Sequence, residues 1–251
     1  MKVYYIGNIC SDEEYNKIIS SSKRKPSVAG PVFENLLLSG FKKLGMDVDI
    51  RTFLNVALYP NSKMILIPSK NEKLKCGYTS KWIPAINLPF FKQLTYKLMA
   101  YIDLKKWIKE NHSVKDKVIL TYSIYDFMTG AALKLGKKFN IPVCAIVPDL
   151  PGNHFELVKA VGIKQKLSGM FIKGSVENQD KFDAYVLLTE QMNEVVNKNN
   201  KPYTIVEGIC STDIFDKYSG VQKYEKKAVM YAGMLGEIHR VGMIARAFMK
   251  V

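Results

Sequence analysis

Apolar positions along the chain fall into short continuous runs, and between these runs lie longer segments in which apolar residues recur every three or four positions. Short apolar runs that stop at glycine, serine or aspartate are typical of strands buried on both faces of a parallel sheet. Such runs predict strands at residues 3–6, 118–123, 143–147, 184–189 and 203–206, with further strands at 48–53 and 64–67.

Helical periodicity follows several of these runs. The first helix is predicted to begin after Ser27, which is suited to cap a helix N-terminus, with apolar positions at Val32, Phe33, Leu36, Leu37, Phe41 and Leu44. A second helix is predicted over 90–109, with a sheet-facing stripe of Phe91, Leu94, Leu98, Tyr101, Ile102, Leu104 and Ile108. The same basic, aromatic helix also fits a membrane surface. Shorter helices are predicted at 127–139, 190–197 and 241–249.

Three segments lack a clear period. Residues 11–25 are polar and predict a mobile loop after the first strand. Residues 76–89 predict an irregular segment with exposed aromatic side chains, and residues 152–182 predict short helices interrupted by glycine.

Strands that alternate with helices predict an α/β domain with a doubly wound, mostly parallel, Rossmann-like sheet. We expect this first domain to occupy residues 1–213, followed by a linker over 214–227. Residues 228–251 are expected to form the first strand and helix of a second domain, with the strand at 228–233.

Candidate chemistry follows from the strand ends. Ligands of doubly wound sheets bind beyond the carboxyl ends of the strands, so Tyr122, Ser123 and Asp149 are expected to border one crevice. Asp149 is equally suited to the turn before Leu150 and Pro151. The capped helix after the first strand leaves backbone N–H groups that suit a hydroxyl or phosphate, and an ordinary connection fits the residues as well.

The chain of 251 residues has a net charge of +14, which raises the question of a polyanionic partner. Only four of its 37 basic residues are arginine, and the lysines are scattered rather than clustered. Specific nucleic-acid recognition favours the arginine fork, so no nucleic-acid partner is expected. A lysine-rich solvated surface and a peripheral contact with an anionic membrane both fit this pattern.

Cysteine and histidine usage narrows the chemistry further. The four cysteines form no C-x-x-C pair, and His112, His154 and His239 lack metal-ligand spacing, so neither a metal site nor a disulfide framework is expected. No apolar run of eighteen residues and no signal peptide is recognised. The sequence therefore predicts a cytoplasmic protein.

Several motifs resemble the two-domain GT-B glycosyltransferases, within them the family 4 group of bacterial capsular and exopolysaccharide synthesis. In chain order, they are Pro26-Ser27-Val28-Ala29-Gly30, Val147-Pro148-Asp149-Leu150-Pro151, Leu188-Thr189-Glu190-Gln191-Met192, the string V-E-G-I-x-S-T-D-I-F from Val206, and Tyr231-Ala232-Gly233-Met234-Leu235 with Gly242 and Ala247-Phe248 after it. The resemblance covers most of the chain.

The resemblance implies an acceptor-binding N-terminal domain of a retaining hexosyltransferase that moves a sugar from a nucleotide-sugar donor to a lipid-linked or polysaccharide acceptor. It needs no metal or further cofactor. On this basis Asp149 is assigned a catalytic role, and the acceptor side is assigned Ser27, Gly30, Tyr122, Ser123 and His154. The donor side is assigned Glu207, Gly233 and Arg240. Glu207 is equally suited to hold the interdomain linker.

The second domain is where the sequence departs from the family. Gly233 is followed by Met234 where many members have arginine, Val241-Gly242 stands in place of Lys-Gly, and Arg246 replaces a glutamate. Arg240 and His239 are the remaining candidates to hold a diphosphate. One strand and one helix cannot bury a core alone, so we expect the chain to be inactive without a C-terminal domain or a complementary subunit. The rival interpretation is a non-catalytic α/β module that binds a glycan or a protein partner.

Overall fold

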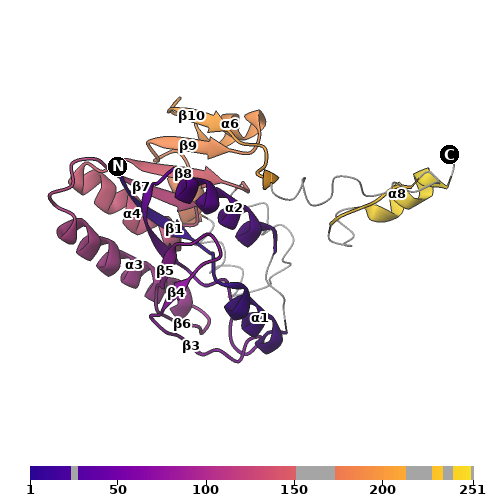
Figure 1. Cartoon of the computed structure of the whole chain (residues 1–251), viewed down its shortest axis with the longest axis horizontal. Helices are drawn as coiled ribbons and strands as arrows, with labels where there is room; N and C mark the ends of the chain where they lie inside the picture. The colour runs from indigo at the N-terminus through magenta and orange to yellow at the C-terminus, as the bar shows by residue number, and fades with distance from the viewer. Residues whose placement is uncertain (24–27, 151–172, 213–227, 234–239, 250–251) are drawn as a thin grey trace. The chain divides into compact units, whose positions relative to one another are not determined.

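The computed structural model describes residues 1–23, 28–150, 173–212, 228–233 and 240–249 (Figure 1). The chain divides into two compact units, Met1–Cys210 and Ser211–Val251. The roles assigned to two domains remain predictions.

The first unit is built on an eight-stranded sheet with the order β10-β9-β8-β7-β1-β2-β5-β4. Neighbouring strands are parallel except for the edge strand β4, which pairs antiparallel with β5. This arrangement confirms the predicted α/β, Rossmann-like class. The strands are β1 (Lys2–Gly7), β2 (Asp47–Thr52), β4 (Asn71–Lys73), β5 (Thr79–Trp82), β7 (Lys117–Tyr122), β8 (Val143–Val147), β9 (Ala184–Leu187) and β10 (Tyr203–Ile205).

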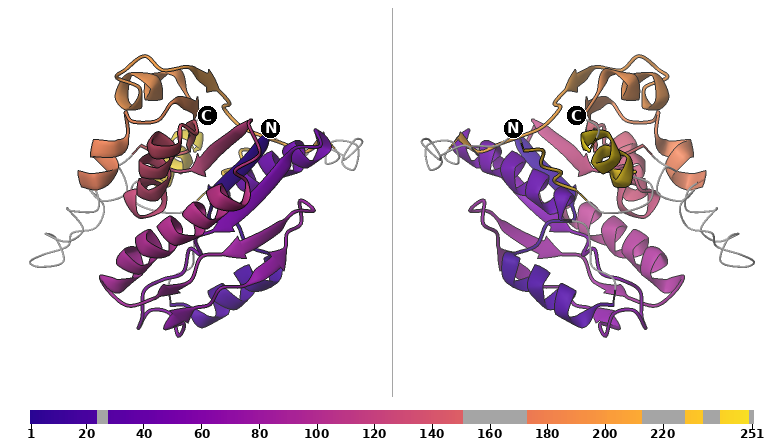
Figure 2. Two further views of the ribbon diagram at one scale, coloured as in Figure 1. Left: turned by 90° about the vertical axis from the view of Figure 1, so that its left-hand side faces the viewer. Right: turned by 90° about the vertical axis from the view of Figure 1, so that its right-hand side faces the viewer.

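Helices cover both faces of the sheet, as Figure 2 shows. On one face α3 (Phe91–Glu110) lies beside α4 (Asp126–Phe139), and on the other lies α2 (Ala29–Lys43). Two further helices of the unit are α1 (Asp12–Ser21) and α6 (Glu190–Val196). The sheet is therefore doubly wound.

Strand β1 contributes side chains to two hydrophobic cores, one on each face of the sheet. Successive side chains of a strand point to opposite faces. Tyr4 and Ile6 accordingly belong to the core under α3 and α4, whereas Val3 and Tyr5 belong to the core under α2. All four side chains are buried, which is why this stretch reads as a continuous apolar run.

The loop predicted over residues 11–25 is wrong for most of its length, because residues 12–21 form α1. Ser11 caps the helix, its Oγ accepting a hydrogen bond of 3.3 Å from the backbone N–H of Glu14. Three acidic residues occupy the first turn, where they meet the positive end of the helix dipole. Ile18 is buried in the core and fixes the helix to the unit.

The predictions for residues 64–67 and 76–89 are also corrected. The strand at 64–67 shrinks to β3 (Leu66–Ile67), which pairs only with β6 (Ala85–Ile86) in a separate small sheet. The supposedly irregular segment supplies β5 to the main sheet. Trp82 is buried because its ring fills the core while its Nε1 donates to Glu72 Oε1 at 2.7 Å.

The inward faces of α2 and α3 match the predicted ones only in part. Phe33, Leu37 and Phe41 of α2 and Leu104 and Ile108 of α3 pack on the cores as predicted. On α2, Glu34 and Leu38 are fully buried, whereas Val32 is exposed, as is Leu44 just after the helix. On α3, the buried residues include Tyr96, Trp107 and Asp103. Tyr96 donates a hydrogen bond to Leu54 O, and Trp107 donates one to Asp49. Asp103 accepts hydrogen bonds from Arg51 of β2 and Lys81 of β5. Four residues predicted to face the sheet are exposed instead, namely Phe91, Leu94, Leu98 and Ile102.

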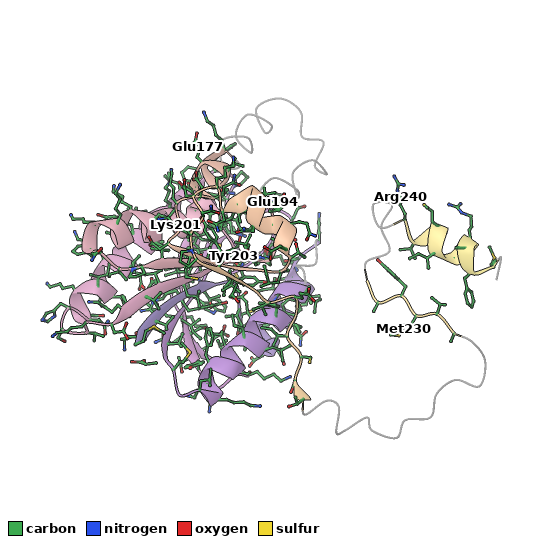
Figure 3. All side chains as sticks on the ribbon, turned by 90° about the horizontal axis from the view of Figure 1, so that it is seen from above. Glu177, Glu194, Lys201, Tyr203, Met230 and Arg240 are labelled. Atoms are coloured by element: carbon green, nitrogen blue, oxygen red, sulfur yellow. The ribbon has the colours of Figure 1, made fainter. Side chains whose placement is uncertain are left out.

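In the second unit, the described residues form one helix, α8 (Val241–Phe248), within which no residue is buried. The strand predicted at 228–233 is wrong, since these residues are described and adopt no strand. A strand requires a hydrogen-bonded neighbour, and none of the described residues of this unit provides one. Met230 and Arg240 of this unit are labelled in Figure 3.

Candidate functional site

The direction of the chain connections reverses between β1 and β7. From β1 the chain continues to β2 on one side, and from β7 it continues to β8, β9 and β10 on the other. In open α/β sheets this switch point, beyond the carboxyl ends of the strands, is where ligands bind. Five residues define the switch-point site in this chain: Asn8, Gly30, Glu34, Tyr122 and Asp149.

Glu34 reaches from α2 across the end of β1. Its carboxylate accepts hydrogen bonds from Tyr5 Oη at 2.9 Å and from the backbone N–H of Asn8 at 3.1 Å. The side chain is fully buried, and this burial raises its pKa to about 8 against the opposing effect of the two donors. Glu34 therefore fixes the turn after β1, and no cation of the described part of the chain lies beside it.

Gly7 makes room for that carboxylate. A Cβ atom at this position would lie 1.9 Å from Glu34 Oε2 and 2.6 Å from Tyr5 Cε1, so any larger residue must displace one of them. The glycine that ends the first apolar run thus serves close packing, which the run itself did not reveal.

Tyr122 ends β7 beneath α2. Its ring lies 6.0 Å from that of Phe33, and a Cβ on Gly30 would lie 3.5 Å from Tyr122 Oη, an ordinary contact distance. Burial raises the pKa of Tyr122, and the nearby acids Glu34 and Asp149 raise it further. The phenol therefore stays protonated and able to donate a hydrogen bond.

Ser123, one residue beyond β7, has a backbone φ of +85°, a conformation that non-glycine residues seldom adopt. Its N–H is held by Ile146 O at 2.8 Å, and its side chain is buried. The strained residue lies directly between Tyr122 and the segment that begins α4. Such strain at a strand end is typical of functional sites.

Asp149 follows β8 and is exposed. It is close enough to raise the pKa of Tyr122 and of Tyr125, after burial in each case. The structure therefore brings Gly30, Tyr122 and Asp149 together, with Ser123 adjacent. Glu34 was missed by sequence reasoning, although an acid within the apolar stretch Val32–Leu38 was a signal for it.

The charge of the switch-point site limits what it can bind. Its two carboxyl groups, those of Glu34 and Asp149, are negatively charged when ionised, and none of its five residues is basic. Carboxyl groups and phenols recognise hydroxyl groups by donating and accepting hydrogen bonds, and an ionised carboxylate repels phosphate. This set of side chains suits a sugar hydroxyl better than a diphosphate.

The other predicted residues lie elsewhere or are not described. Glu207 follows β10, and β9 and β8 lie between β10 and β7. Three strand spacings of about 4.8 Å place the end of β10 roughly 14 Å from the end of β7, where Tyr122 lies. Gly233 and Arg240 belong to the second unit, and Arg240 precedes α8 with a φ of +46°. Ser27 and His154 lie outside the described residues, and the described N-cap position of α2 is Val28.

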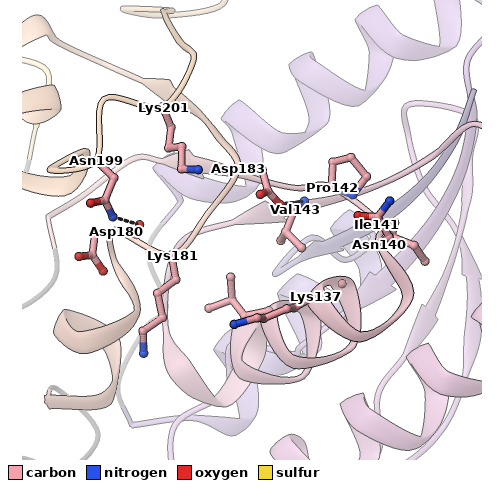
Figure 4. Close-up of a pocket in the computed structure, with 12 residues that line it drawn as sticks. Lys137, Asn140, Ile141, Pro142, Val143, Asp180, Lys181, Asp183, Asn199 and Lys201 are labelled. Carbon is pink, nitrogen blue, oxygen red and sulfur yellow. Dashed lines mark hydrogen bonds between the residues drawn. The ribbon is translucent and has the colours of Figure 1, made fainter.

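A hollow of about 740 Å³ lies at the opposite, amino ends of the strands. Figure 4 shows its border, formed by the end of α4, the start of β8 and the segments that lead into β9 and β10. Its polar lining residues are Lys137, Asn140, Asp180, Lys181, Asp183, Asn199 and Lys201.

The chemistry of this hollow is less suited to a reaction. Asp183 is already engaged by the backbone N–H of Val143 at 2.9 Å, and Lys181 by Asn178 at 2.9 Å. Lysines near the carboxyl end of α4 balance the negative end of its dipole. We therefore place the functional site at the switch point, where strand ends and helix starts converge.

Within the parts of the chain that are described, no group of three or more histidine, cysteine, aspartate or glutamate side chains could hold a metal ion. Nor does any described helix combine the length and apolar character required to cross a bilayer.

The first unit thus has a doubly wound α/β architecture. No family model and no curated protein matches the chain. Among solved structures it is similar to sucrose-phosphate synthase from Thermosynechococcus elongatus, with a TM-score of 0.44 and 11% identity. The match covers 82% of this chain and 48% of the synthase chain, so the chain spans about half the length of that structure. The likeness is one of fold, and it decides nothing about chemistry.

Proposed function

We propose that residues 1–210 form the acceptor-binding unit of a glycosyltransferase. The enzyme transfers a sugar from a nucleotide-sugar donor to a lipid-linked or polysaccharide acceptor in cell-surface polysaccharide synthesis, with retention of anomeric configuration. The observation that carries the proposal is the convergence of Tyr122, Asp149 and Gly30 at the switch point between β1 and β7.

The chemistry of that site supports an acceptor rather than a donor. A phenol held protonated beside an exposed carboxylate can donate to one sugar hydroxyl and accept from another. In the proposed mechanism Asp149 orients the attacking hydroxyl, and Tyr122 fixes the sugar ring that carries it. Holding the nucleophile in place in this way lowers the entropic part of the barrier.

The donor side needs a second unit. A leaving diphosphate requires basic side chains or helix N-termini, and the five described residues of the switch-point site include neither a lysine nor an arginine. We assign that role to a C-terminal domain or complementary subunit. Gly233 and Arg240 would be its first donor-binding residues, and Glu207 would lie near the linker between the two domains. The proposal requires no metal or cofactor beyond the nucleotide-sugar substrate.

A glycan array tests acceptor binding with the chain itself. We expect the protein to bind a subset of bacterial surface glycans, and Tyr122→Phe and Asp149→Asn each to weaken that binding by about tenfold, the loss of roughly one hydrogen bond to a charged or well-placed partner. Tyr101→Phe, on α3, is the matched control and should bind like the parent chain. Absence of glycan binding by a folded chain would contradict the proposal.

A transfer assay then separates an enzyme from a binding module. The chain, completed by a C-terminal domain, is incubated with bacterial membranes and radiolabelled UDP-glucose, UDP-galactose, UDP-N-acetylglucosamine or GDP-mannose. Label in the lipid or polysaccharide fraction, lost with Asp149→Asn, is the expected result. Glycan binding without transfer from any donor would instead favour the non-catalytic module.

A further inference from the structure

The outer face of α3 is apolar where a surface helix is usually polar. Phe91, Leu94, Leu98 and Ile102 are 53%, 64%, 52% and 50% exposed, although the opposite face of the same helix is buried in the core. Their spacing of three or four residues places them in one stripe along the helix. In the left panel of Figure 2 the helix faces the viewer beside α4.

The turn before α3 extends this stripe. Phe90 adopts a backbone φ of +68° and remains 46% exposed. A non-glycine residue in that conformation costs of the order of 1 kcal/mol, and here the cost serves to present another aromatic ring to the outside. Two adjacent exposed phenylalanines thus begin the apolar stripe.

The carboxyl half of the same face is basic. Lys105 and Lys109 follow Leu98 and Ile102 by seven residues, which is two helical turns, so they continue the stripe. They line a cavity of about 470 Å³ together with His112, Lys117, Ile108, Phe139 and Ile141. No acidic residue lines it, and neither Lys105 nor Lys109 forms an ion pair with another described residue.

We propose that the outer face of α3 is a docking surface for an anionic lipid membrane. The stripe from Phe90 to Ile102 inserts among the acyl chains near the headgroups, and the cavity at Lys105 and Lys109 receives a lipid phosphate. An apolar stripe followed by a lysine-lined cavity matches the order of apolar and anionic groups in a lipid leaflet. This inference stands independently of the proposed glycosyl transfer.

Charge argues for a membrane over a second copy of the chain. In a symmetric dimer the same patch is buried on both copies, so one interface would have to bury Lys105 and Lys109 of each copy. The chain carries a net charge of +14, which further disfavours self-association and favours a negatively charged surface.

Vesicle flotation tests the docking surface with the full chain and no nucleotide sugar present. The chain should float with vesicles of phosphatidylcholine containing one quarter phosphatidylglycerol, and only weakly with phosphatidylcholine alone. Leu94→Ser combined with Leu98→Ser should lower the partition coefficient by about tenfold or more, since two inserted side chains are lost. The matched control combines Leu44→Ser with Leu66→Ser, which are exposed by 78% and 66% elsewhere in the unit.

A second pair of variants tests the basic cavity. Lys105→Gln with Lys109→Gln should reduce binding to the anionic vesicles roughly 25-fold, because each lysine near such a surface contributes about fivefold. Lys73→Gln with Lys75→Gln removes the same charge from an exposed edge and should have a much smaller effect. Equal losses for both lysine pairs, or unchanged binding by the leucine variant, would overturn the proposal. So would a dimer in sedimentation that the leucine variant dissociates while vesicle binding is absent.

Discussion

Two consecutive tyrosines of β1 donate hydrogen bonds to two buried carboxyl groups whose surroundings differ. Tyr4 points to the face under α3 and donates to Asp103 at 2.9 Å, while Tyr5 points to the face under α2 and donates to Glu34 at 2.9 Å. Asp103 is also bound by Arg51 and by Lys81, the latter at 2.6 Å. Glu34 has the backbone N–H of Asn8 and, among the residues that the structure describes, no cation.

The difference appears in the pKa of each acid. Burial alone raises the pKa of a carboxyl group, and it does so for Glu34, to about 8. At Asp103 burial acts in the same direction, but Arg51 and Lys81 outweigh it and the pKa is lowered. Removing one partner of a buried, paired acid is costly, whereas a buried acid with no cation beside it among the described residues, next to a switch point, is more typical of a working site.

The largest effect should come from Asp103→Asn. Removing this charge leaves Arg51 buried without its partner, and breaking a buried pair in this way costs about 3 kcal/mol in the free energy of unfolding. Urea unfolding measures it. Asp116→Asn, at a pair with the N-terminal amine in which Asp116 is 75% exposed, should change stability by less than about 0.5 kcal/mol. Similar losses for both variants would contradict the comparison.

Glu34→Gln should change how stability depends on pH. The pKa of Glu34 in the folded chain lies above the ordinary value of 4.5, so its contribution to stability is fully present below pH 4.5 and is lost as pH rises towards about 8. The variant should therefore gain stability relative to the parent chain across this interval, because glutamine has no proton to lose. Urea unfolding of both proteins at the two ends of the interval measures the gain. A constant difference would show that Glu34 titrates normally.

Gly7→Ala should cost about 2 kcal/mol, because its Cβ would lie 1.9 Å from Glu34 Oε2. Thermal unfolding reports the loss, and the same substitution in a Glu34→Ala background should cost less because the clashing carboxylate is gone. Gly40→Ala on α2 is the matched control, since no atom lies within 4 Å of its added Cβ. That control should be neutral or stabilising, as alanine favours a helix interior.

Lys97→Met should have the smallest effect. Its Nζ lies 2.8 Å from Asp126 Oδ2, and the lysine is 53% exposed. Solvent screens such a pair, so its loss should lower the free energy of unfolding by about 0.5 kcal/mol in a chemical denaturation experiment. A loss as large as that of Asp103→Asn would show that burial does not distinguish the two pairs.

The sequence identified the α/β class because the buried strands are continuous apolar runs, and those of β1, β7, β8 and β9 were located correctly. Helix α1 was missed because its composition is polar, although Ser11 and Glu14 have the spacing of a helix cap. Strand β5 was missed because its aromatic residue was interpreted as exposed. In the structure Ser80 and Trp82 alternate inward, as in any half-buried strand.

The helix faces and part of the site depended on tertiary contacts. Tyr96 and Trp107 turn α3 inward through hydrogen bonds to Leu54 O and Asp49, partners that lie more than forty residues away and that no local period reveals. Glu34 was missed for the same reason, because its role depends on Gly7 and Tyr5. Tyr122 and Asp149 could be predicted to lie close together because the ends of neighbouring parallel strands meet at one edge of the sheet, and their role in a site stays a prediction.

The central claim is that the chain binds an acceptor glycan at the switch point between β1 and β7. The most direct test is a crystal structure of the chain soaked with the glycan that binds most tightly on the array. We predict the glycan within hydrogen-bonding distance of Tyr122 Oη or the Asp149 carboxylate. A glycan bound instead in the hollow beside Lys137 and Lys201, with the switch point unchanged, would contradict the claim.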